Sequence, residues 1–292
     1  MKRLGIFLLL ILVLSACGGV SGQDSGEGDQ GKNKDQTAQE TDEKKDSTEE
    51  EKEENKENKP EKAEKNKESE EAAAEASPEA PKEAQYQLTG NWSFEPINDA
   101  EPKVALLTID DAPDEHGVEM AKTLKAADAP AIFFVNGHFI DSEEGKEKLR
   151  KIHELGFPIG NHTMTHASLP DLSQEEQKEE IVGLNDKIEE IIGERPKFFR
   201  APFGQNTDYS EQLAAEENML LMNWTYGYDW NEEYMDADNL ADIMVNTDLL
   251  GNGANLLMHD REWTNDALED IVKGLRSKGY DLLDPALIKT PE

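Results

Sequence analysis

The chain has 292 residues, of which 64 are acidic and 30 are basic, so its formal net charge at pH 7 is −34. This excess of negative charge repels a phosphate backbone, and no Lys/Arg stripe interrupts it, which excludes nucleic acid as a partner. A single cysteine excludes an internal disulfide, so a secreted form would depend on a core large enough to fold without covalent cross-links.

The first 17 residues have the pattern of a secretion signal. A basic start precedes an apolar run from Gly5 to Val13, which is too short to span a bilayer about 30 Å thick. The Leu-Ser-Ala-Cys sequence that ends at Cys17 resembles the lipobox of bacterial lipoproteins, in which the cysteine thiol receives a diacylglycerol. We therefore expect a signal peptide over 1–17 and a lipid anchor at Cys17, on the extracytoplasmic face of the cell membrane. The alternative is an ordinary signal peptide with an incidental cysteine.

Residues 18–84 are predicted to form a disordered linker. Between Asp24 and Ala84 the chain has 22 acidic and 11 basic residues and no aromatic residue. Such a segment buries too little apolar surface to offset the conformational entropy of ordering it. As a flexible coil it would reach roughly 45 Å, enough to hold the following domain away from a membrane surface.

The remaining residues, 85–292, are predicted to form one α/β domain. Short apolar runs alternate with longer amphipathic runs, a pattern typical of strands and helices around a parallel sheet. The predicted strands are 104–109, 131–135, 158–160, 197–199, 220–224 and 255–258. The predicted helices are 118–127, 146–155, 174–192, 209–217, 237–247 and 265–278.

Polar residues follow several of these strands, at the strand ends where parallel α/β folds build their active sites. Asp110 and Asp111 follow the first strand. Adjacent carboxylates on a strand point to opposite sides, so one could bind a cation while the other handles a proton. The alternative is a turn or a helix cap.

His162 and His166 follow the third predicted strand. Histidines four residues apart lie on one face of a helical turn and can bind one divalent ion. A carboxylate from Asp111 would add a third ligand and leave positions open for water and substrate, as in a hydrolytic site. The alternative is that both histidines face solvent.

Three further polar positions lie after later strands. Arg200, in the segment Arg-Ala-Pro-Phe-Gly, can hold a carboxylate in a bidentate ion pair, or it is a surface arginine in a tight turn. The Asp229-Trp230 pair follows strand 220–224. His259 leaves the last strand, where a lone histidine is also compatible with a structural role.

In this order and separation, the segments Thr-Ile-Asp-Asp, His-Thr-Met-Thr-His, Arg-Ala-Pro-Phe-Gly, Asp-Trp and Leu-Met-His-Asp resemble the motifs of the polysaccharide deacetylases, carbohydrate esterase family 4. The resemblance covers about residues 103–283. It implies a distorted (β/α) barrel of seven or eight strands, with a metal-dependent site that removes acetyl groups from N-acetylated sugars.

The resemblance also implies a role for each matching residue. Asp111, His162 and His166 match the ligands of a divalent metal, commonly Zn²⁺, with Co²⁺, Ni²⁺ and Mn²⁺ as alternatives. Asp110 matches the general base that takes a proton from the attacking water. Arg200 matches the residue that orients this base.

The remaining motifs imply the other half of the site. His259 matches the general acid that protonates the departing amine, and Asp229 is the best available carboxylate to support it. The backbone N–H of Phe203 matches an oxyanion donor. A group of aromatic residues could stack on sugar rings or pack in the core: Trp224, Tyr226, Tyr228, Trp230 and Trp263.

The expected substrate is cell-wall glycan, and more specifically the N-acetylated amino sugars of peptidoglycan, because the tether confines a monomeric domain between membrane and wall. Three positions depart from the family pattern; Met258, before His259, is a mild change, and the other two leave alternatives open. Ala112 replaces the usual glycine, and Tyr226 replaces an aspartate found in many members. One alternative is a weakly active or inactive glycan-binding lipoprotein that stabilises the wall. The other is an O-acetyl esterase, because an ester needs less help from an acid.

Overall fold

The computed structural model describes residues 83–292. The predicted signal peptide, the lipidation site at Cys17 and almost all of the predicted linker lie outside the described residues. Among the described residues, no helix combines the length and the apolar character that crossing a membrane requires.

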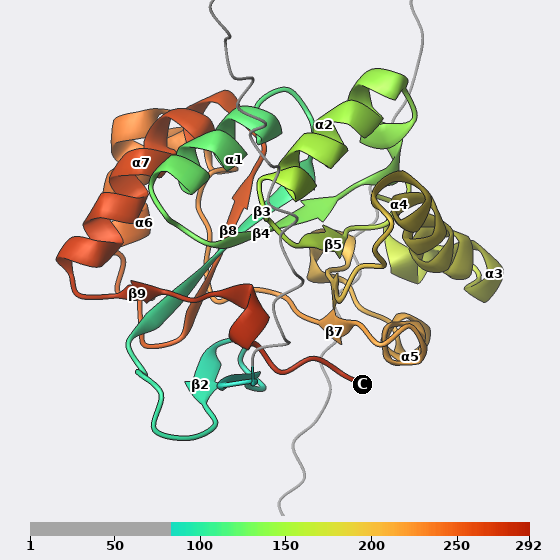
Figure 1. Cartoon of the computed structure of the whole chain (residues 1–292), viewed down its shortest axis with the longest axis horizontal. Coiled ribbons are helices and arrows are strands. Elements are labelled where there is room, and N and C mark those ends of the chain that lie inside the picture. Colours follow the sequence, from blue (N-terminus) through green and yellow to red (C-terminus); the bar gives the residue numbers. More distant parts are fainter. Residues whose placement is uncertain (1–82) are drawn as a thin grey trace, which may run out of the picture. The chain divides into compact units, whose positions relative to one another are not determined.

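A curled sheet of seven strands forms the centre of the domain, in the order β7-β6-β5-β4-β3-β8, with β9 also paired to β3 (Figure 1). All of its strand pairs are parallel, which confirms the α/β class. The strands of this sheet are β3 (Val104–Ala112), β4 (Ala131–Val135), β5 (Ile159–Asn161), β6 (Phe198–Phe199), β7 (Leu220–Leu221), β8 (Ala254–His259) and β9 (Asp281–Leu282).

The two ends of the sheet approach each other through the segment that follows β7. An isolated parallel bridge joins Tyr226 to Leu256 of β8, and the Leu257 N–H donates to the Tyr226 carbonyl oxygen at 2.9 Å. The sheet therefore closes through a single bridge instead of a full strand. This arrangement confirms the expected distorted (β/α) barrel.

Seven α-helices among the described residues surround the sheet. Consecutive contacts run through α6, α7, α1, α2 and α4, while α3 contacts α5. The side chains of Ser142, Ser173, Thr207 and Asp236 cap the first turns of α2, α3, α5 and α6. The helices are α1 (Gly117–Ala126), α2 (Glu143–Glu154), α3 (Gln174–Lys178), α4 (Leu184–Ile192), α5 (Asp208–Glu216), α6 (Ala237–Asn246) and α7 (Glu262–Ser277).

The structure differs from the predicted elements in three places, one of which is β9, a strand that was not predicted. The helix predicted over 174–192 is divided by a π-helical turn, η3 (Glu179–Gly183), between α3 and α4. A short antiparallel hairpin of β1 (Tyr86–Leu88) and β2 (Phe94–Pro96) precedes the sheet and was not predicted. The short 3-10 helices are η1 (Gly137–Ile140), η2 (Leu169–Asp171), η4 (Pro202–Gly204), η5 (Glu232–Tyr234) and η6 (Pro285–Leu287).

Candidate active site

A cavity of about 520 Å³ lies at the carboxyl ends of β3, β5 and β8. It brings together most of the side chains that the sequence singles out, from segments far apart in the sequence. The lining residues are Asp110, Asp111, His162, His166, Phe203, Trp224, Asp229, Trp230, Met235, Leu257, His259, Arg261 and Trp263.

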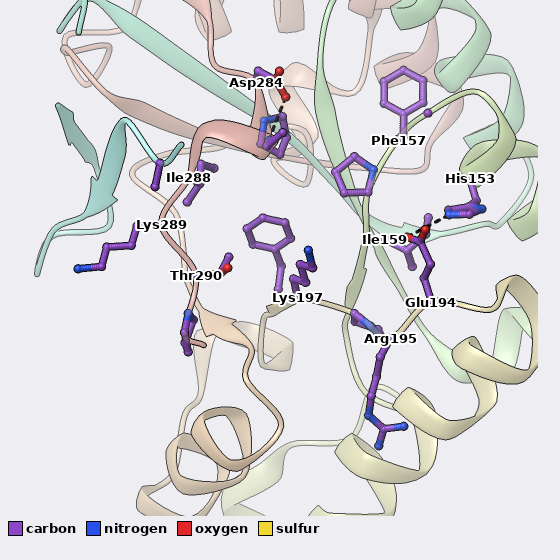
Figure 2. A pocket seen from close by; sticks show the side chains of 18 of the residues that line it. His153, Phe157, Ile159, Glu194, Arg195, Lys197, Asp284, Ile288, Lys289 and Thr290 are labelled. Carbon is purple, nitrogen blue, oxygen red and sulfur yellow. Dashed lines mark hydrogen bonds and ion pairs between the residues drawn. The ribbon is translucent and has the colours of Figure 1, made fainter. Parts of the chain in front are cut away.

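A larger pocket of about 1110 Å³ lies at the amino ends of the strands, where β5 and β6 begin (Figure 2). It contains none of the predicted site residues. Two of its charged groups are paired with other side chains: His153 Nε2 lies 3.3 Å from Glu194 Oε2, and Arg195 pairs with Glu217 at 2.7 Å. The convergent polar groups therefore place the candidate active site in the smaller cavity.

The two adjacent aspartates do not point to opposite sides, contrary to the prediction. The pairing of β3 with β4 shifts register between Ile109 and Ala112, and Asp111 has a φ of 59°. This bulge breaks the alternation of side chains along the strand. As a result, Asp110 Oδ2 lies 3.5 Å and Asp111 Oδ1 lies 3.9 Å from His162 Nε2.

The two histidines are brought together by a backbone conformation that the sequence did not indicate. The segment after His162 is a loop and not a helical turn, with a φ of 69° at Thr163 and 61° at His166. The imidazole rings lie edge to face with centroids 5.0 Å apart. His166 Nε2 lies 3.6 Å from Asp111 Oδ1, so the predicted grouping forms although the predicted helical turn is wrong.

The chemistry of this group fits a divalent cation. One ligand atom each from Asp111, His162 and His166 lies within 4.8 Å of the others. His162 Nδ1 lies 2.7 Å from the Arg200 carbonyl oxygen, and because a carbonyl only accepts, Nδ1 carries the hydrogen and Nε2 keeps its lone pair. One oxygen and two nitrogen donors are a set that suits Zn²⁺.

The electrostatics keep these ligands in the forms that bind metal. Burial alone would raise the pKa of Asp111, but the neighbouring histidines and Arg261 lower it below its ordinary value. Burial and the nearby His162 lower the pKa of His166. An ionised carboxylate and a neutral imidazole are therefore favoured at neutral pH.

Arg200 lies fully buried beneath the site, and burial lowers its pKa. Its Nη1 donates to Asp110 Oδ1 at 2.6 Å and to Thr108 Oγ1 at 2.8 Å. The contact with Asp110 uses one nitrogen, so it is not the bidentate pair that the sequence suggested. The guanidinium also lies 4.3 Å from the centre of the Phe134 ring, which fixes its plane from a second side.

His259 and Asp229 form a second pair across the cavity. His259 Nδ1 lies 2.8 Å from Asp229 Oδ1, and the His259 backbone N–H donates to Oδ2 at 2.6 Å. Thr264 Oγ1 donates to the same Oδ2. Burial alone would lower the pKa of His259, but the hydrogen bond and the charge of Asp229 raise it above its ordinary value.

The two departures that leave alternatives open do not disturb this geometry. The left-handed φ lies at Asp111, and Ala112 is not among the positive-φ residues, so its Cβ meets no backbone strain. The Tyr226 hydroxyl donates to the Met244 carbonyl oxygen inside the core. Within residues 83–292, Asp229 is the carboxylate that pairs with the His259 imidazole.

Large apolar side chains border the cavity. Phe203 is 61% exposed, Trp230 44% and Met235 43%. The Phe203 ring contacts His166 edge to face, and the Trp230 ring contacts His259 in the same way. Of the five aromatic residues predicted as a stacking group, Trp224, Trp230 and Trp263 line the cavity, whereas Tyr226 and Tyr228 do not.

Sequence reasoning missed Arg261, the residue before α7. Its Nη2 donates to Asp111 Oδ2 at 2.8 Å, and its Nη1 donates to the Asp260 carbonyl oxygen. The ion pair uses the Asp111 oxygen that does not face the histidines. No motif marks this residue, because only the fold brings its long side chain to β3.

The family model described as polysaccharide deacetylase matches residues 97–221. The chain is 32% identical over 194 residues to a peptidoglycan-N-acetylglucosamine deacetylase of Bacillus cereus, covering 63% of this chain and 70% of that protein. It is 31% identical over 188 residues to the peptidoglycan-N-acetylmuramic acid deacetylase PdaC of Bacillus subtilis, covering 63% of this chain and 38% of that protein.

Solved structures agree with these sequence matches. The structure of PdaC superposes with a TM-score of 0.56 at 30% identity, covering 64% of this chain and 91% of the solved one. A family 4 carbohydrate esterase from Streptomyces lividans, solved in complex with acetate, superposes with a TM-score of 0.55 at 26% identity. That match covers 63% of this chain and 92% of the solved one.

Proposed function

The chain belongs to the polysaccharide deacetylases of carbohydrate esterase family 4, and from this premise we propose that it removes N-acetyl groups from the amino sugars of peptidoglycan and releases acetate. One observation carries the proposal. The Asp111, His162 and His166 cluster and the His259–Asp229 pair border the same cavity. The similarity to two peptidoglycan deacetylases supports a cell-wall substrate.

Asp111, His162 and His166 would hold the divalent cation, with Zn²⁺ as the best fit to their donor atoms. When bound, this ion supplies Lewis-acid polarisation of the acetyl carbonyl and lowers the pKa of water. The Arg261 ion pair occupies Asp111 Oδ2 and leaves Oδ1 for the cation.

Asp110 would act as the general base. Arg200 holds its Oδ1, while Oδ2 lies 3.5 Å from His162 Nε2. This arrangement fixes the carboxylate so that Oδ2 can accept a proton from the attacking water. Because Asp110 is only 2% exposed, competing bulk water has little access to it.

His259 would act as the general acid on the other side of the cavity. An amide nitrogen leaves poorly unless it is protonated, so cleavage of an N-acetyl group requires a positioned proton donor. Asp229 holds the Nδ1 side of the ring, and Nε2 is then the atom that donates to the amine. The backbone N–H of Phe203 would bind the oxyanion, and the exposed faces of Trp230 and Phe203 would pack against sugar rings.

The complete His259–Asp229 pair supports amide hydrolysis over the two alternatives. An esterase has less need of a proton donor at the leaving group. A purely glycan-binding protein has no need for Asp110 to be oriented by a buried arginine. The backbone at Ala112 and the core position of Tyr226 remove the two reasons for expecting a weakened site.

Acetate release tests the proposal. The full chain is incubated with purified peptidoglycan, with chitooligosaccharides and with O-acetylated glycan, each with and without a chelator. We expect chelator-sensitive release from N-acetylated substrates. Asp110→Asn should lower the rate by about 10² to 10⁴ while zinc binding is retained, and the exposed Asp248→Asn should leave the rate unchanged.

Release from the O-acetylated glycan alone would identify an esterase instead. Glycan binding without release would identify a binding protein. Because the two peptidoglycan relatives act on different amino sugars, analysis of the digested products assigns the deacetylated residue.

We also propose that the chain is a monomer anchored by Cys17 on the extracytoplasmic face of the membrane, with 18–84 as the linker and 85–292 as the catalytic domain. The Leu-Ser-Ala-Cys segment supports this location. Cys17→Ala should abolish incorporation of labelled lipid and move the protein from the membrane fraction. Continued lipid labelling of this variant would contradict the anchor.

A further inference from the structure

A π-helical turn faces the loop that carries both histidine ligands. η3 interrupts the long helix between α3 and α4, and π-helical turns inside helices are frequent at functional sites. Its neighbour is the loop 161–166. None of the catalytic roles proposed above explains what holds the backbone of this loop in place. The contacts between the two segments show what the turn does.

Two carbonyl groups of the turn accept hydrogen bonds from outside the helix. The Met164 N–H donates to the Glu180 carbonyl oxygen at 2.9 Å. Asn161 Nδ2 donates to the Ile181 carbonyl oxygen at 2.8 Å, and Asn161 Oδ1 accepts from the Thr163 N–H at 2.9 Å. The loop is thus attached to the turn on both sides of His162.

The Glu180 side chain adds two stronger bonds. Thr165 donates its backbone N–H to Oε2 at 2.8 Å and its hydroxyl to Oε1 at 2.6 Å. Glu180 is only 8% exposed, so its carboxylate depends on these donors for stabilisation. Both carboxylate oxygens are therefore committed to one residue, which lies between the two histidines in the sequence.

The loop needs such support because its backbone is unfavourable. Thr163 and His166 both have positive φ values, which non-glycine residues keep only when their surroundings hold them there. On the other side of the loop, the N–H groups of Gly137 and His138 donate to the carbonyl oxygens of Thr163 and Met164. The loop is clamped between η1 and η3.

We propose that Glu180 is a positioning residue for the metal site, and that the π-helical turn which carries it preorganises the His162–His166 loop for cation binding. The inference rests on the proposed metal-dependent function. Glu180 does not line the cavity, and its carboxylate bonds to Thr165 and not to a ligand atom. It acts through Thr165, by holding the backbone that sets the spacing of the two imidazoles.

Zinc affinity of the purified full chain tests this role by competition with a chromophoric chelator. In Glu180→Gln the amide nitrogen cannot accept from Thr165, so we expect the zinc dissociation constant to rise about tenfold. Thr165→Val removes only the hydroxyl arm and should give a smaller rise. In the double variant, the rise in the zinc dissociation constant should be smaller than the product of the two single rises, because both changes affect the bond between the Thr165 hydroxyl and Glu180.

Glu179→Gln is the matched control. It removes the same charge from the neighbouring, exposed residue of the same turn, and we expect its zinc affinity to equal that of the wild type. Circular dichroism of each metal-free variant at the assay temperature shows whether it is folded. If Glu180→Gln does not fold, the zinc affinity of Thr165→Val carries the test.

Equal zinc affinity in folded Glu180→Gln, folded Thr165→Val and the wild type would overturn the inference and leave the proposed deacetylase intact. An equal loss in Glu179→Gln would also overturn it, since the effect would then be one of charge alone. A wild-type chain that binds no zinc would instead refute the metal site on which both proposals depend.

Discussion

Asp229 raises the pKa of His259 through one hydrogen bond to the imidazole ring and through its negative charge. His259 works as an acid in its protonated form, which is present below its pKa and lost as pH rises through that value. In Asp229→Asn the raised pKa of His259 should fall, because the charge that raises it is removed. We therefore expect the alkaline limb of kcat/KM for acetate release to move to lower pH, as measured in a pH–rate profile.

The exposed Asp248→Asn provides the control, and its alkaline limb should coincide with that of the wild type. If the alkaline limb of the pH–rate profile of Asp229→Asn also stays in place while the rate falls, another group sets this limb and His259 is not the acid. A shift toward higher pH would contradict the direction of the electrostatic argument.

The sequence predicted the members of the site better than the way they meet. Asp110, Asp111 and the two histidines could be recognised because each follows an apolar strand. Their convergence depends on a bulge and on left-handed backbone at Asp111 and His166. These conformations could not be predicted, because neither residue is a glycine. Arg261 was missed because a contact between residues 150 positions apart has no local pattern.

At the scale of elements, β5 depends on a glycine for its fit against β4. A Cβ added at Gly160 would lie 2.5 Å from the Phe134 ring, and that ring packs against the Arg200 guanidinium. Gly160→Ala should therefore destabilise the fold by about 1 to 3 kcal/mol through overpacking. Urea unfolding of the metal-free chain measures the change in the free energy of unfolding.

Gly251→Ala is the matched control, because a Cβ there meets nothing within 4 Å. Its free energy of unfolding should stay within about 0.5 kcal/mol of the wild type. Equal stability of the two variants would show that Phe134 moves aside freely, contrary to the tight packing of β4 and β5.

α7 could be predicted because its hydrophobic periodicity persists over 16 residues. The buried strands β3 and β4 could be predicted because each contains a continuous apolar run. β1, β2 and β9 were not predicted because they are two or three residues long and, unlike the equally short β6 and β7, do not consist of consecutive apolar residues. The π-helical turn was missed because one extra residue in a helix changes the register of side chains without changing composition.

For the whole molecule, zinc should stabilise the fold. The proposed ligands come from β3 and from the loop after β5, so the unfolded chain has no preformed site. Zinc at about 100 times its dissociation constant should add about 2.7 kcal/mol of stability, which raises Tm by roughly 5 to 11 °C for a domain of this size. Differential scanning calorimetry with zinc and with chelator measures the shift. The 22 acidic residues between Asp24 and Ala84 could also attract the ion, but if they belong to the disordered linker proposed above, the ion binds them equally in the folded and the unfolded chain. The shift should therefore vanish in His166→Ala, and an equal shift in that variant would place the stabilising ion elsewhere.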